Sequence, residues 1–340
     1  MSAAEHVQAD DLASQSEEHR AGLIAHCYRM LGSFHDAEDA TQEALLRAWR
    51  KRDGFRGEAS LKTWLYRIAT RVCLDLMRSR ARRLTPASVA GPAIPTLPPK
   101  APVTEISWLE PLPTEAARTD LDPAAAYSQT ESVKLAFIAA LQALTPGQRA
   151  VLILRDVLAW STAETAETLG LSEPAASSAL HRARQRLRQT YHPAGVDAFP
   201  GPEPEDPRVR TMLAAYVDAW RRSDVDGLVE TLRTDVRIAM PPSPSWYRGR
   251  DDVLEVLRTW VWSRGEFQLR AASYNAQPAF QTWLVGPGPE IHFAIQVLVV
   301  DRDGISAIDF FVPGPSLTDD HAIGSQPVLR AHVRGGASRA

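Results

Sequence analysis

Two proline-rich segments decide how this chain of 340 residues can fold. One spans residues 84–126 and the other 193–206. Because proline fixes φ and lacks a backbone N–H donor, we expect extended or irregular linkers there rather than packed elements. Outside them the sequence predicts three folded blocks, at residues 19–83, 127–192 and 207–315. A disordered N-terminal tail is expected at 1–18 and a frayed C-terminal tail at 316–340.

The charge distribution distinguishes the first block from the rest. The whole chain has a net charge of −3, from 38 Lys and Arg against 41 Asp and Glu. Residues 19–83 alone carry 14 basic and 7 acidic side chains. A local excess of positive charge is typical of a phosphate-binding surface, because electrostatic attraction decays over about 10 Å in ordinary salt.

The cysteines and the hydropathy pattern bear on metals and on the cell compartment. Cys27 and Cys73 lie in apolar stretches without the spacing of metal ligands, so we expect reduced, buried thiols and no metal or cofactor. No N-terminal stretch resembles a signal peptide, and no run approaches the roughly 18 apolar residues of a membrane span. We therefore expect a cytoplasmic protein with no membrane partner.

Hydrophobic periodicity separates helical blocks from a mixed one. The first block has helical spacing in three stretches, at about 19–31, 35–49 and 61–80. The third block mixes helices with β-type runs, the latter at about 236–240, 267–273, 279–285, 291–300 and 305–312. Helices followed by strands of this length predict an α+β domain with a curved antiparallel sheet.

The second block has the helix-start and helix-end signals of a helix-turn-helix. Thr145 with Gln148, and Ser161 with Glu164, have the pattern of capping boxes that begin helices. Gly170 is placed to end the short helix that the second box begins. Two helices joined by a tight glycine-containing turn predict a motif whose second helix enters the major groove of DNA.

The segment from Asp36 to Trp49, DAEDATQEALLRAW, places acidic residues before an apolar helix face. It resembles region 2.2 of bacterial RNA polymerase sigma factors of the extracytoplasmic-function (ECF) kind, which implies docking on the clamp helices of the polymerase β′ subunit. The alternative is a helix that only caps itself and packs its apolar face. The residues implied in binding the polymerase core are Asp36, Glu38, Asp39, Gln42, Glu43 and Leu46.

The segment from Phe55 to Ala69 resembles sigma region 2.3–2.4, which opens the promoter −10 element. Duplex opening needs aromatic surface against unstacked bases and cations along the phosphates. Trp64 is equally compatible with a place in the core, and Arg71 stands where many ECF sigma factors have asparagine. The residues implied at the −10 element are Phe55, Arg56, Lys62, Trp64, Arg67, Arg71, Arg78 and Arg80.

The helix after the glycine turn resembles the recognition helix of sigma region 4.2, which reads the −35 element. Its alternate arginines cannot share one face at 100° per residue, so some should grip phosphates while apolar residues pack inward. The family often has basic residues where Ser177 and Ala179 stand, so −35 contacts should be weaker or altered. The residues implied at the −35 element are Ala175, Ala176, Ser177, Ser178, His181, Arg182, Arg184 and Arg186.

The third block resembles SnoaL-like domains of the NTF2 and ketosteroid-isomerase superfamily, through residues 215–220, 223–228 and 246–249. The resemblance implies a cone-shaped domain around a pocket lined by Tyr216, Met240, Trp246, Tyr247 and Gln296. Met240 stands where the isomerase has its catalytic base, and a thioether cannot abstract a proton, so we expect a pocket that binds a small ligand or packs on the linker. Another reaction through Asp235, His292 or Asp309 is the alternative.

Together the motifs predict a multidomain protein: an all-α sigma region 2, a helix-turn-helix sigma region 4 and an α+β NTF2-like cone. The function implied is a sigma factor, not an enzyme, whose partners are RNA polymerase core and promoter DNA. Trp108 in the first linker is expected to dock in a groove on the C-terminal domain or on the polymerase. This suggests that the C-terminal domain regulates the sigma factor in cis. Two alternatives stay open: a one-component DNA-binding regulator with a ligand-sensing domain, and a SnoaL-like enzyme fused to a DNA-binding module.

Overall fold

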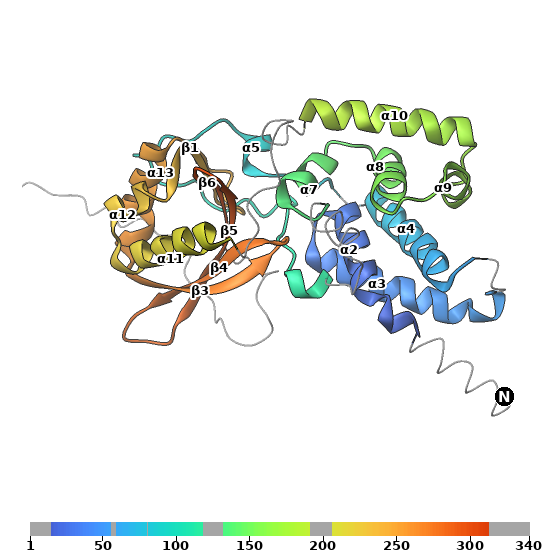
Figure 1. Cartoon of the computed structure of the whole chain (residues 1–340), viewed down its shortest axis with the longest axis horizontal. Coiled ribbons are helices and arrows are strands. Elements are labelled where there is room, and N and C mark those ends of the chain that lie inside the picture. Colours follow the sequence, from blue (N-terminus) through green and yellow to red (C-terminus); the bar gives the residue numbers. More distant parts are fainter. Residues whose placement is uncertain (1–14, 56–58, 80, 118–131, 191–205, 313–340) are drawn as a thin grey trace, which may run out of the picture.

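The computed structural model of the chain has a helical half and a half built around one β-sheet (Figure 1). It describes residues 15–55, 59–79, 81–117, 132–190 and 206–312. Apart from Asp206, the second linker lies outside the described residues, as does the expected C-terminal tail. Of the expected disordered N-terminal tail, residues 15–18 are described and are helical.

The first block is a bundle of three helices, as predicted: α2 (Arg20–Leu31), α3 (Phe34–Arg50) and α4 (Leu61–Ser79). Gly32 ends α2 with a φ of 72°, a left-handed conformation that glycine adopts without strain. The hydroxyl of Ser33 then accepts a hydrogen bond from the backbone N–H of Asp36 and begins α3. The apolar faces of the helices enclose a core that includes both cysteines.

The second block is the expected helix-turn-helix. Both capping boxes form: Thr145 Oγ1 accepts from the Gln148 N–H at 3.4 Å, and Ser161 Oγ accepts from the Glu164 N–H at 3.1 Å. Gly170 ends its helix with a φ of 66°. The helices are α7 (Leu135–Leu141), α8 (Pro146–Leu152), α9 (Thr162–Leu169) and α10 (Glu173–Thr190), with a π-helical turn at Ile153–Val157.

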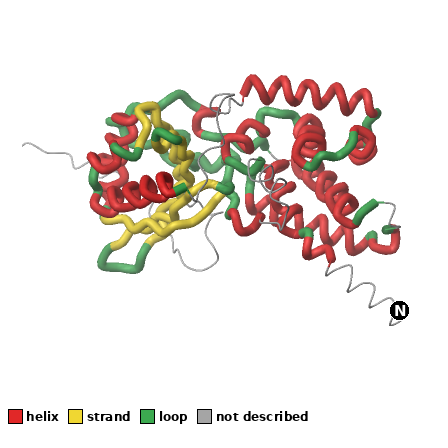
Figure 2. Tube along the Cα trace, viewed as in Figure 1, coloured by secondary structure: helices red, strands yellow, loops and turns green. Residues whose placement is uncertain are grey.

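The third block is an α+β domain with a six-stranded sheet in the order β2-β1-β6-β5-β4-β3. All neighbouring strands are antiparallel except β1 and β6. Helix α11 (Pro207–Arg222) packs along the sheet, with α12 (Val225–Val229) and α13 (Arg250–Val256) at its end (Figure 2). The strands are β1 (Leu232–Ala239), β2 (Trp246–Arg248), β3 (Glu266–Tyr274), β4 (Gln277–Val285), β5 (Ile291–Asp301) and β6 (Gly304–Phe311).

The first linker differs from the expectation. It is largely irregular, with short helical turns at Pro86–Val89 (α5) and Thr114–Ala117 (η2), but it is packed. Trp108 is 7% exposed and Leu112 is fully buried. The prolines exclude regular structure, yet the backbone N–H groups of Ala93, Val103 and Glu110 donate to carbonyls on other segments, so parts of the linker pack without it. Among the described helices none is long and apolar enough to cross a membrane.

Candidate polymerase and promoter interfaces

The face of α3 implied in polymerase binding is largely open to solvent. Asp39, Gln42 and Leu46 are exposed, with Leu46 at 45%. Glu38 is partly buried, and Glu43 accepts from Arg47 Nε at 2.7 Å one turn later. An exposed leucine beside carboxylates suits a basic, amphipathic partner helix.

Asp36 is the exception, because the linker covers it. Its carboxylate accepts from Arg83 Nη2 at 2.6 Å, and Arg83 Nη1 donates to Glu110 at 2.7 Å. Glu110 also accepts from the hydroxyl of Ser33 at 2.6 Å, and all four side chains are mostly buried. The start of α3 is therefore bound by Arg83, just before the linker, and by Glu110 inside the linker.

The residues implied at the −10 element have different surroundings. The Phe55 and Trp64 rings lie 5.0 Å apart, and Trp64 is partly buried against the helical core, as the alternative for it predicted. Lys62 is exposed, and Arg78 is exposed and pairs with Asp75 at 2.8 Å. Arg56 and Arg80 lie outside the described residues.

Two of the −10 cations contact the helix-turn-helix: Arg67 is partly buried there, whereas Arg71 stays exposed. Both terminal nitrogens of Arg67 donate to the Glu167 carboxylate of α9, at 3.0 and 2.8 Å. Arg71 Nε lies 3.5 Å from the carbonyl oxygen of Thr168. A DNA phosphate would have to displace the Glu167 carboxylate, which is 66% exposed, to reach Arg67.

On α10, most of the residues implied at the −35 element are exposed: Ala175, Ser177, Ser178, His181, Arg182, Arg184 and Arg186. Ala176 is a correction. It is 2% exposed because it lies on the same helix face as the buried Leu180 and Ala183, four and seven positions later. Arg184 pairs with Asp156 at 2.6 Å, so a phosphate would have to displace that carboxylate.

The tip of the β3–β4 hairpin joins the C-terminal domain to the rest of the chain. The Asn275 side chain is fully buried, and its Nδ2 donates to the Tyr28 hydroxyl at 2.8 Å and to the Val133 carbonyl at 2.7 Å. Its Oδ1 accepts from the Leu112 N–H at 2.9 Å, and its own N–H donates to the Leu112 carbonyl at 2.7 Å. Burial raises the pKa of the Tyr28 phenol, which stays neutral and donates to the Glu110 carbonyl.

The residues expected to line the C-terminal pocket are mostly inside the core. Tyr216, Tyr247 and Gln296 are fully buried and Met240 is 7% exposed. The Tyr216 hydroxyl donates to Gln296 Oε1 at 2.6 Å, and burial keeps the phenol neutral by raising its pKa. Trp246 contacts the linker, since its Nε1 donates to the carbonyl of Ala90 at 2.7 Å, and none of these five residues lines the hollow described next.

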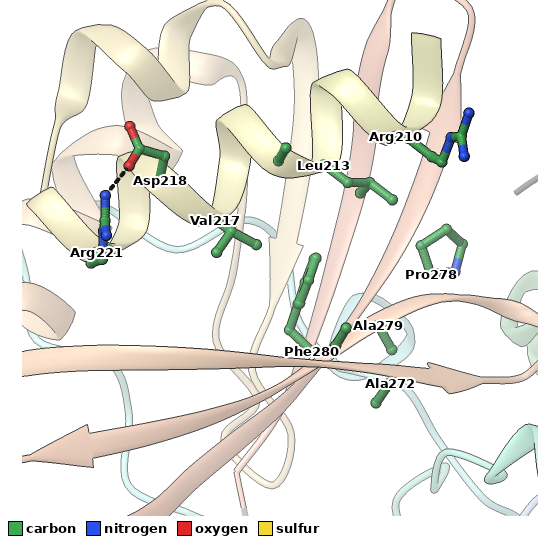
Figure 3. A pocket seen from close by; sticks show the side chains of 11 residues that line it. Arg210, Leu213, Val217, Asp218, Arg221, Ala272, Pro278, Ala279 and Phe280 are labelled. Carbon is green, nitrogen blue, oxygen red and sulfur yellow. Dashed lines mark hydrogen bonds and ion pairs between the residues drawn. The ribbon is translucent and has the colours of Figure 1, made fainter. Parts of the chain in front are cut away.

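An open hollow lies beside those residues, between α11 and strands β3 and β4 (Figure 3). It has a volume of about 550 Å³ and a mostly apolar lining that includes Leu213, Val217 and Phe280. Phe280 stacks on Tyr216 with ring centroids 5.9 Å apart, which separates the hollow from the buried interior. No metal-binding cluster of His, Cys, Asp and Glu is found among the described residues.

Comparison with known families agrees with this arrangement. A model of sigma-70 region 2 matches residues 16–83, a model of sigma-70 region 4 matches 134–187, and a model of the SnoaL-like domain matches 213–307. The class defined is a two-region sigma factor with an added SnoaL-like domain.

The similarity to individual proteins shows which group of sigma factors the chain belongs to. The ECF RNA polymerase sigma factor SigG of Mycobacterium tuberculosis is 40% identical over 304 residues, which cover 89% of this chain and 81% of the relative. SigJ of the same species is 31% identical over 250 residues, covering 72% of this chain and 71% of the relative. A crystal structure of M. tuberculosis SigJ matches with a TM-score of 0.57 at 24% identity, over 89% of this chain and 97% of that one. The chain therefore belongs to the ECF RNA polymerase sigma factors.

Sequence reasoning missed the residues that hold the domains together. Glu110, Glu167 and Asn275 make contacts across 27 to 247 positions, which no local pattern reports. One signal existed: Asn275 and Ala276 form a two-residue hairpin turn with φ of 55° and 53°, and asparagine is favoured in such turns. That signal predicts a turn but not what the turn contacts.

Proposed function

We propose that this sigma factor docks on the β′ clamp helices through the exposed face of α3, and that α4 and α10 recognise the −10 and −35 elements. The C-terminal domain restrains both activities in cis. The protein directs promoter-specific initiation in the cytoplasm and catalyses no reaction. The lack of catalysis is supported by Met240, whose thioether stands where a SnoaL-like isomerase needs a base.

The observation that carries the regulatory proposal is the insertion of Asn275 between three other parts of the chain. Its side chain contacts Tyr28 of region 2, Leu112 of the linker and Val133 at the start of region 4. Buried hydrogen bonds of this kind contribute about 1 kcal/mol each, and more when one partner is left unsatisfied. The hairpin therefore favours the closed arrangement in which Arg67 is bound to Glu167.

The linker contacts support the same proposal. The Ala93 N–H donates to the Trp246 carbonyl at 2.8 Å, and the Val103 N–H donates to the Pro242 carbonyl at 3.0 Å. Trp260 Nε1 donates to the Pro95 carbonyl at 3.0 Å. A linker held along the C-terminal domain cannot extend to let regions 2 and 4 reach two separate promoter elements.

Run-off transcription with core polymerase and the full-length chain tests the proposal. Asn275→Gly keeps the left-handed turn while removing the side-chain contacts, because glycine adopts positive φ without strain. We expect several-fold more transcript than from the wild-type chain. The control is Gln268→Ala, an exposed position on the same hairpin, which should behave as wild type. Equal promoter use and equal core binding by all three proteins would refute regulation by this contact.

A further inference from the structure

A small cavity lies between regions 2 and 4. One wall is formed by the end of α4 and residues 81–83 after it, and the other by the turn between α7 and α8 together with α8. Its volume is about 230 Å³. The charged groups that line it are three guanidiniums and one carboxylate: Arg82, Arg83, Arg149 and Asp36.

Arg149 is the most unusual of these groups. It is 3% exposed, and its hydrogen bonds go to neutral acceptors: the carbonyls of Met30 and Leu144 and the amide oxygen of Gln142. Its buried Nε–H has no hydrogen-bond partner. Burial and the neighbouring charge of Arg82 lower the pKa of Arg149 to about 9.

The carbonyl of Met30 belongs to the last turn of α2, so the helix dipole offsets part of this charge. That contribution is about half an elementary charge. Among the described residues Arg149 forms no ion pair with a carboxylate. A buried cation without a counterion is costly, which leaves a free-energy gain for any anion that can reach it.

The other two arginines differ in how far they are neutralised. Arg83 is paired with Asp36 and Glu110. Arg82 is exposed and has no ion pair with the described residues. The cavity therefore keeps a net positive charge contributed mainly by Arg82 and Arg149.

We propose that this cavity binds a phosphate-type anion, with Arg82 and the Nε–H of Arg149 as its principal donors. Guanidinium groups match tetrahedral oxyanions through charge-assisted hydrogen bonds. A cavity of 230 Å³ has the volume of roughly eight water molecules, which suffices for an orthophosphate or diphosphate group. A nucleoside attached to such a group would have to extend out of the cavity.

Because the donors come from both regions, anion binding depends on how the two regions are packed. Arg82 lies just after region 2's last helix and Arg149 lies in region 4, so the anion is bound only while the two regions are packed together. A ligand that binds one conformation stabilises it according to its concentration relative to its dissociation constant. The anion therefore favours the closed sigma factor.

Calorimetric titration of the full-length chain with inorganic diphosphate, at constant ionic strength, tests the proposal. We expect saturable one-to-one binding that Arg82→Gln weakens about tenfold, the loss of about 1.4 kcal/mol. Arg78→Gln is the matched control, since Arg78 is an exposed arginine near the end of α4, four positions before Arg82, and it does not line the cavity. Arg149→Lys keeps the charge but removes the Nε–H, and should also weaken binding.

The proposal is overturned if the heats do not saturate, or if Arg82→Gln and Arg78→Gln have the same affinity as the wild-type chain. A parallel titration with ADP distinguishes the source of the anion. Binding as tight as that of diphosphate supports a nucleotide, and weaker binding supports the free anion.

Discussion

Asn275 Nδ2 lies 2.8 Å from the phenol oxygen of Tyr28, and the two residues are 247 positions apart in the chain. The same phenol donates to the carbonyl of Glu110, and the Glu110 carboxylate accepts from Arg83, which in turn binds Asp36. A continuous chain of hydrogen bonds thus connects the C-terminal domain to the first turn of the helix implied in polymerase binding. Buried networks of this kind specify one arrangement when all their members are satisfied.

Glu167→Gln should increase the affinity of the full-length chain for single-stranded DNA. The change weakens the pairing that occupies Arg67, and exposed ion pairs contribute about 0–1 kcal/mol, so we expect an increase of about two- to fivefold. Fluorescence anisotropy with a labelled oligonucleotide measures it, with Glu266→Gln as an exposed acidic control. High salt should reduce the difference, because it screens both interactions. An unchanged affinity at low salt would contradict the competition.

Glu110→Ala should loosen the linker and lower stability. It leaves Arg83 and Ser33 without their shared acceptor in a mostly buried place, at a cost of about 2–3 kcal/mol. Thermal unfolding measures the loss, and limited proteolysis should show earlier cleavage in the linker. Glu105→Ala, an exposed position in the same linker, should change neither. Indistinguishable unfolding of the two variants would argue against this role for Glu110.

Leu46→Glu should weaken binding to core polymerase without affecting the fold. Leu46 is 45% exposed, so a charge there disturbs little of the core, but it would remove an apolar anchor from the proposed interface. We expect affinity to fall about tenfold, as for a single interface anchor. Leu97→Glu, at a 56% exposed leucine of the linker, is the control. Binding and thermal unfolding measured on the same samples separate a lost contact from a lost fold.

His26 should make the free energy of unfolding depend on pH. Burial lowers the pKa of the ring to about 3, whereas the unfolded chain protonates it near about 6.5. The unfolded state therefore takes up the extra proton between these values, and stability falls as the pH drops through that window. The contribution lost from about pH 7.5 to about pH 5.5 is about 1.4 kcal/mol.

Denaturant unfolding of His26→Gln at both pH values checks this expectation. The variant should lack that part of the acid sensitivity, while His181→Gln, at an exposed histidine, should keep it. Equal pH dependence in His26→Gln and the wild-type chain would show that another group is responsible.

Local patterns predicted the secondary structure well. The helix begun by Ser161 and ended by Gly170 forms as expected, because capping hydrogen bonds and a left-handed glycine act over three or four residues. Five strands of the third block lie within a few residues of the β-type runs, but the short strand β2 (Trp246–Arg248) was not predicted. Local patterns predicted side-chain exposure less well. Ala176 is buried on the inner face of α10, and Trp246 donates a hydrogen bond to the linker rather than lining the pocket.

The sequence by itself determined the three blocks, their helices and strands, and the resemblance to ECF sigma factors, because periodicity, caps and motifs are local properties of the chain. Only the tertiary structure decided that residues 108–112 of the proline-rich linker are buried, that Glu167 pairs with Arg67, and that Asn275 contacts three other parts of the chain. These contacts depend on which surfaces meet after folding. Two residues 247 positions apart leave no periodic signal, and their pairing follows only from the packing of all the elements between them.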